Sequence, residues 1–127
     1  MSTLHFKDSE FVKTSTGLDN NLPDAFIERR DAIFAKLELL RSVNNGRPIV
    51  INSGYRSQAV NSAVGGVPLS KHCSALAVDI TCGSKTLNQR LFASLINYIE
   101  FDYCIIEHDF QWLHVEFIGG RKRISFQ

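Results

Sequence analysis

Two short segments, Ala77-Val78-Asp79-Ile80-Thr81 and Trp112-Leu113-His114-Val115-Glu116-Phe117, decide the expected fold of this chain. Apolar and polar residues alternate in both, and successive side chains of a strand point to opposite faces of its sheet. The apolar positions predict a core face for each strand: Val78 and Ile80 in the first, and Leu113, Val115 and Phe117 in the second. If the two strands share one sheet, Asp79 and His114 converge on its opposite, polar face.

Periodicity and turn residues around these two segments predict the other elements. Helices are expected over Leu22–Asn45, where apolar residues recur at helical spacing before Gly46, and over Gln58–Val64 and Thr86–Ile99. Further strands are expected at Pro48–Asn52 and Tyr103–Glu107, and Ile124–Phe126 is a candidate last edge strand. The strand that carries Asp79 is expected to span Ala75–Thr81, and the strand that carries His114 to run from Trp112 to Ile118. Together these predict an α+β fold in which helices pack on one face of a mainly antiparallel sheet.

Length and composition bound the class of protein. The chain has 127 residues, 44% of them hydrophobic, which suits one domain over residues 1–127 with its own core. Its net charge of +1 argues against nucleic-acid binding, and we expect a monomer. No apolar run approaches the ~18 residues that span a bilayer, so no membrane insertion is expected. The N-terminus lacks the regions of a signal peptide, which predicts synthesis in the cytoplasm without an export signal.

Residue type makes a metal site plausible, although spacing alone does not establish one. His72 falls on the predicted loop from Ser70 to Cys73, directly before the Asp79 strand, and can complete a set of three ligands with Asp79 and His114. Two imidazoles and a carboxylate suit zinc, and three protein ligands leave a position for water. A structural role for each residue is the competing interpretation, because a His and an Asp seven positions apart are common by chance. The three cysteines have no CxxC spacing, which argues against a cysteine-rich zinc module, and Cys73, directly after His72, is the one alternative ligand among them.

A series of short motifs, in a fixed order along the chain, favours the metal site over purely structural roles for these residues. The chain contains Ser53-Gly54-Tyr55-Arg56-Ser57, Asn61, Gly65-Gly66, Ser70-Lys71-His72, Ala77-Val78-Asp79 and Trp112-Leu113-His114-Val115. This series resembles the D-Ala-D-Ala carboxypeptidase family of zinc peptidases, and most closely its small phage-type members, from about Phe6 through Phe117. The resemblance implies the hedgehog/D,D-peptidase fold, with zinc bound by His72, Asp79 and His114.

The chain departs from the family pattern in two places. Ala75 stands where the second motif usually has a glycine, which we expect to adjust the loop without removing a ligand. Gln111 stands three residues before the last histidine, where carboxypeptidases of the family have their catalytic carboxylate. Glutamine cannot accept a proton from water, so another base is needed. Phage-type members end the preceding strand with a glutamate, which makes Glu107 the first candidate here and leaves Asp109 and Glu116 as alternatives.

The same resemblance suggests the remaining roles. Arg56 is expected to stabilise an oxyanion or hold a substrate carboxylate, and Ser70 and Tyr55 to donate hydrogen bonds to the substrate. The implied function is hydrolysis of bacterial peptidoglycan stem peptides by metal-activated water, as a D,D-carboxypeptidase or a lysin-like endopeptidase that acts on the cell wall after release. The alternative is a catalytically inactive zinc-binding interaction domain of the same fold, which the loss of the usual base at Gln111 favours.

Overall fold

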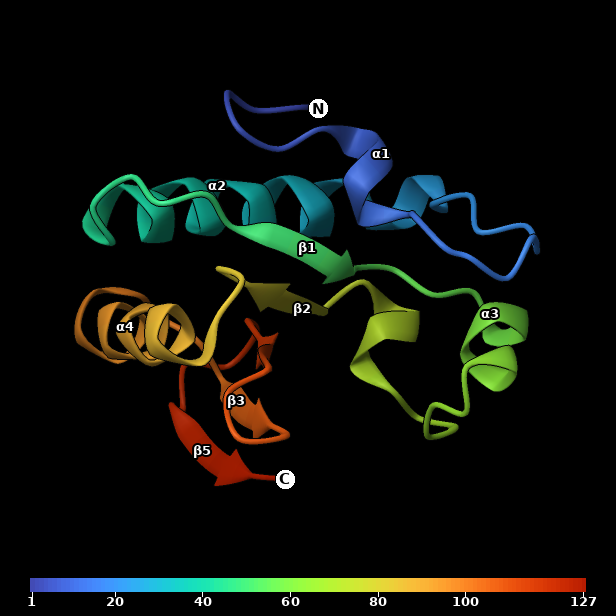
Figure 1. The fold of residues 1–127 in the computed structure, drawn as a ribbon. Helices are drawn as coiled ribbons and strands as arrows, with labels where there is room; N and C mark the ends of the chain where they lie inside the picture. The colour runs from blue at the N-terminus through green and yellow to red at the C-terminus, as the bar shows by residue number, and fades with distance from the viewer.

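A five-stranded sheet forms the centre of the computed structural model, which describes residues 1–127 (Figure 1). The strands lie in the order β1-β2-β4-β3-β5. Their bounds are β1 Val50–Ser53, β2 Ala77–Thr81, β3 Tyr103–Glu107, β4 Trp112–Glu116 and β5 Arg123–Phe126. The first three neighbouring pairs are antiparallel, and only β5 runs parallel to its neighbour β3. The predicted α+β class is confirmed, with a mixed sheet whose one parallel pair lies at the edge.

Strand register determines which side chains meet on the polar face. Asp79 of β2 pairs directly with His114 of β4, and His114 pairs on its other side with Ile105 of β3. Two residues further along the same pair of strands, Glu107 at the end of β3 pairs with Trp112 at the start of β4. Directly paired or diagonal residues of adjacent strands lie within ~8 Å of each other, so the polar side chains of three strands gather on one surface.

Side-chain caps explain where two of the helices begin. Ser57 accepts a hydrogen bond from the Val60 amide at the start of α3 (Gln58–Ala63), and Ser84 caps α4 (Lys85–Tyr98) in the same way. The long helix α2 spans Ile27–Val43 and is preceded by a 3₁₀ turn, η1, at Asp24–Phe26, so the predicted start at Leu22 was several residues early. Two short elements were not predicted, α1 (Asp8–Phe11) and the 3₁₀ turn η2 (Lys71–Ser74).

The core lies between the two long helices and the apolar face of the sheet. α2 and α4 contact each other, and α4 contacts β4 of the sheet (Figure 1). Fully buried side chains come from both helices and from the inward positions of the strands: Phe34, Leu37 and Leu40, Leu91 and Leu95, and Ile51, Ile80, Leu113 and Val115. Burial of each stabilises the fold by ~1.5–3 kcal/mol relative to exposure. None of the helices combines the length and apolar character needed to cross a bilayer.

Candidate metal centre and its cleft

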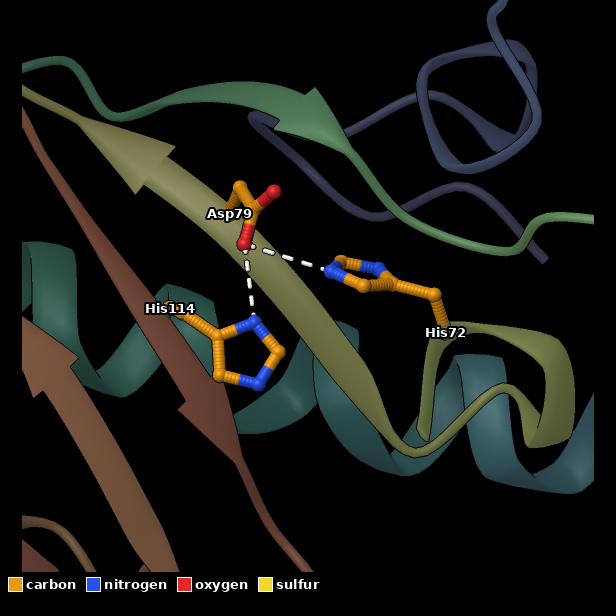
Figure 2. Close-up of side chains that lie close together, drawn as sticks. All are labelled: His72, Asp79 and His114. Carbon is orange, nitrogen blue, oxygen red and sulfur yellow. Dashed lines mark hydrogen bonds and ion pairs between the residues drawn. The ribbon is translucent and has the colours of Figure 1, made fainter. Parts of the chain in front are cut away.

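Three side chains from separate segments converge on the polar face of the sheet (Figure 2). Asp79 projects from β2, His114 from β4, and His72 from η2 at the end of the sheet. Asp79 Oδ1 lies 3.2 Å from His72 Nε2 and 3.0 Å from His114 Nδ1. One potential ligand atom from each residue falls within 4.8 Å of the other two. The three residues proposed from the sequence are therefore brought together in space.

His72 is fixed by the backbone of the neighbouring loop. The residue is 2% exposed, and its Nδ1 lies 2.7 Å from the Gly54 carbonyl oxygen, which leaves Nε2 facing Asp79. A Cβ at Gly54 would approach the Phe11 carbonyl oxygen to 2.5 Å, so only glycine allows this loop to pack closely enough against α1. The Gly54 position therefore supports the orientation of His72.

His114 lies between two carboxylates. Its Nδ1 faces Asp79, and its Nε2 lies 2.9 Å from Glu116 Oε2. Burial alone would lower the pKa of His114, but the hydrogen bonds to Asp79 and Glu116 and their negative charges raise that pKa to about 9. A proton and a metal ion would compete for the same lone pair on Nδ1, so metal binding there requires the neutral imidazole.

Asp79 is oriented through both of its oxygens. Oδ1 faces the two histidines, and Oδ2 lies 3.4 Å from Arg56 Nη2. Burial would raise the pKa of the Asp79 carboxyl, but the hydrogen bonds and charges of His114 and His72 outweigh it and hold that pKa well below its usual range. The Arg56 guanidinium donates two further hydrogen bonds, to Ser53 Oγ at 3.0 Å and to Asn61 Oδ1 at 3.3 Å.

His72, Asp79 and His114 would hold a zinc ion, and the two separations from Asp79 Oδ1 test the fit. Zinc bonds to imidazole nitrogen and carboxylate oxygen are about 2.0–2.2 Å long, which separates neighbouring ligand atoms by roughly 3.3 Å in tetrahedral geometry. The observed separations of 3.2 and 3.0 Å are close to that value. Two nitrogens and one oxygen with no fourth protein ligand are also the donor set of hydrolytic metal centres rather than of closed structural ones.

A cleft of about 580 Å³ opens over this cluster, which is large enough for a short peptide segment. A second hollow, of about 310 Å³, meets it at Arg56, Asp79 and Trp112. A ligand that reaches the cluster can therefore extend to both sides of it.

Comparison with known proteins agrees with this geometry. A family model described as Peptidase M15 matches residues 4–116, most of the chain. The chain belongs to the peptidase M15 family. The predicted resemblance to the D-Ala-D-Ala carboxypeptidase family of zinc peptidases is confirmed.

One curated relative of this M15 chain is the zinc D-Ala-D-Ala carboxypeptidase of Streptomyces albus G, which is 40% identical over 84 residues. The alignment covers 65% of this chain and 33% of the relative. The chain thus spans about a third of the length of the curated protein it matches.

The other predicted site residues of this M15 chain divide into two groups. Glu107 and Ser70 line the cleft, and Ser70 Oγ also accepts a hydrogen bond from the His72 amide at 3.2 Å. Tyr55 does not line it: the residue is 8% exposed and its ring packs in the core against Phe26, so the structure does not bring it to a substrate. Asp109 does not line the cleft, and its side chain is 75% exposed and paired to Lys85 at 2.7 Å.

Sequence reasoning missed residues that brace the M15 site. Asn20 donates to the Val12 and Tyr55 carbonyls and accepts from the Ser57 amide, which ties the N-terminal segment to the loop that carries Arg56. A lone asparagine in a loop gives no signal in a sequence. Glu116 as the partner of His114 was within reach, because residues two apart on a strand share a face.

Proposed function

We propose that this chain is a zinc-dependent peptidase that hydrolyses the peptide stems of bacterial peptidoglycan. The observation that carries the proposal is the convergence of His72, Asp79 and His114, with the spacing of an open metal site, on the floor of a peptide-sized cleft. Membership of the peptidase M15 family and the name of the Streptomyces relative support the reaction and the metal.

Each group at the site has a defined task in such a reaction. Zinc, when bound, supplies Lewis acidity that polarises an amide carbonyl and makes a water molecule acidic near neutral pH. Arg56, which lines both hollows, is positioned to donate hydrogen bonds to an oxyanion or to a substrate carboxylate. Ser70 is a second donor at the wall of the cleft.

We assign proton transfer to Glu107, on a comparison of the three candidate carboxylates. Glu116 is engaged with His114 Nε2, and Asp109 with Lys85 outside the cleft. Glu107 lines the cleft, and its carboxylate has no hydrogen-bond partner within the protein. It lies diagonally across the β3–β4 pair from His114, at ~7–8 Å between backbones, a distance that a glutamate and one water molecule can span. Its carboxylate would accept a proton from the attacking water and pass it to the leaving amine.

The test is mass spectrometry of purified peptidoglycan after incubation with the zinc-loaded protein and, in parallel, with its Glu107→Gln variant. Release of terminal D-alanine identifies a carboxypeptidase, and fragments of cleaved cross-links identify a lysin-like endopeptidase. Digestion by the parent and not by the variant is the expected result. Stoichiometric zinc without any digestion would instead favour the inactive interaction domain.

A further inference from the structure

The edge strand β5 adds a wall to the cleft that the family match does not include, because that match ends at residue 116. β5 pairs with β3 so that Arg123 lies beside Tyr103 and Ser125 beside Ile105. Arg123 and Gln127 both line the cleft that contains the three candidate metal ligands. β5, which supplies Arg123 to the cleft, therefore lies outside the residues that the family model matches.

Two contacts hold the Arg123 side chain in place. Its guanidinium carbon lies 4.6 Å from the centre of the Tyr103 ring, within cation–π distance. Its Nη2 donates to Asp102 Oδ2 at 3.0 Å. The Tyr103 ring is itself fixed at its far end, where its hydroxyl lies 2.8 Å from Ser125 Oγ. A guanidinium held on a rigid ring loses less entropy when it binds a ligand.

Arg123 is more than a structural partner of Asp102, because that carboxylate is already satisfied without it. Asp102, 3% exposed, accepts two hydrogen bonds of 2.8 Å from the Arg121 side chain, through Nε and Nη2. One carboxylate thus faces two guanidinium groups and cannot neutralise both of their charges. The Arg123 side chain donates a single hydrogen bond within the protein, so Nε and Nη1 remain available, and the side chain is 45% exposed.

Sheet geometry gives the position of this charge relative to the ligand cluster. β5 and β4, the strand of His114, are separated by β3 alone. Two strand spacings amount to roughly 10 Å, which corresponds to about three residues of an extended peptide. Arg123 therefore lies too far from the cluster to act on the reacting bond, but close enough to contact the same substrate.

We propose that Arg123 is a specificity-determining residue that binds a carboxylate of an acidic peptide, about two or three residues away from the scissile bond. This deepens the proposed function and rests on it for the identity of the bond. A planar guanidinium with two free donor groups favours a carboxylate over a neutral amide, because charge-assisted hydrogen bonds are roughly twice as strong as neutral ones.

The experiment measures binding rather than turnover. Zinc-loaded Glu107→Gln protein is titrated with capped alanine pentapeptides that carry one glutamate at successive positions, and with matched peptides that carry glutamine. We expect tighter binding of the glutamate peptide at one position, by about tenfold, as one charge-assisted hydrogen-bond pair provides. Adding Arg123→Gln should abolish that preference, and adding Arg123→Lys should restore part of it.

Lys122→Gln, in the same background, is the matched control. Lys122 precedes β5 and bonds the Ile96 carbonyl, and it does not line the cleft, so the preference should persist. Equal weakening of both peptides by Arg123→Gln, or loss of thermal stability that Arg123→Lys fails to restore, would show a structural residue and overturn the proposal. So would a Glu107→Gln protein that binds no glutamate peptide in preference. Because no peptide is cleaved, failure of the parent to digest peptidoglycan bears only on the proposed function.

Discussion

On the β2–β4 side of the cleft, both ring nitrogens of His72 and His114 and both oxygens of Asp79 have partners, whereas on the β3 side the Glu107 carboxylate has none. His72 and Asp79 are buried, whereas His114 and Glu107 are both half-buried, so the two sides differ more in their hydrogen-bond partners than in their exposure. These two regions lie on adjacent strands of the same face.

The difference corresponds to two physical tasks. A metal ligand must be held within a few tenths of an ångström, which requires buried partners that fix ring orientation and tautomer. A group that exchanges protons with water must keep its lone pairs free and within reach of solvent. Variants on each side should consequently fail in different ways.

The largest effect is expected from removal of a ligand. His72→Ala, Asp79→Ala or His114→Ala should each abolish activity and sharply weaken zinc binding, because two donors cannot form the open three-ligand site. Zinc content is measured on the dialysed protein by atomic spectrometry, beside the digestion assay. Cys73→Ser is a control next to His72, and full zinc retention is expected there. A His72→Ala protein that keeps zinc and activity would end the assignment.

The second largest effect is expected from Glu107→Gln, which tests the unpaired carboxylate on the β3 side of the cleft. We expect zinc content and fold to be retained while turnover falls by ~10²-fold or more, the lower range for loss of a general base. Asp109→Asn is the matched control two residues away, with no expected effect on turnover. The base has been misassigned if Glu107→Gln stays active while Asp109→Asn or Glu116→Gln is inactive.

Glu116→Ala should weaken zinc binding rather than remove the base, although Glu116 is a carboxylate in the cleft. It removes the partner of His114 Nε2, and loss of such an outer contact typically weakens metal affinity by about 10–100-fold. Competition with a chromogenic chelator gives the zinc affinity, and saturating zinc should restore most of the activity. Activity that stays lost at saturating zinc would place Glu116 in the chemistry.

Much of this comparison can be anticipated from the sequence, because the alternation of apolar and polar residues in two strands is enough to put Asp79 and His114 on one face. Strong local signals also predict the long helices, the strands and the edge strand β5. Short elements such as η2 escape prediction, since four residues cannot show a helical period.

The sequence does not predict which polar side chains of the cleft have hydrogen-bond partners, as the three ligands do, and which, like Glu107, have none. This difference depends on contacts between segments far apart in the sequence, such as His72 Nδ1 to the Gly54 carbonyl or Asn20 to the Tyr55 carbonyl, that no spacing rule connects. The misplacement of Tyr55 has a related cause. It follows Gly54 and precedes Arg56 in a motif assigned to the site, but the chain turns its ring into the core.

The smallest effect is expected at Ala75. It tests whether the turn after η2, which carries His72, tolerates an alanine where the family pattern has a glycine. Ala75 follows η2 with φ 57° and ψ 37°, a left-handed conformation that a glycine adopts without strain and alanine only at a cost of roughly 1 kcal/mol. The methyl group is fully buried, however, and its removal costs about 0.8 kcal/mol. Because these terms oppose each other, Ala75→Gly should change the free energy of unfolding by no more than about 1 kcal/mol and leave zinc affinity unaltered.

Urea unfolding of the zinc-free protein measures that balance, and Ala75→Val is the contrasting variant. A β-branched side chain in a left-handed, fully buried position should cost more than about 2 kcal/mol, because backbone strain and overpacking then act in the same direction. A comparable loss in Ala75→Gly would mean that packing of the methyl group, and not backbone conformation, governs this turn. The alanine would then be a residue on which the position of His72 depends, rather than a tolerated replacement for glycine.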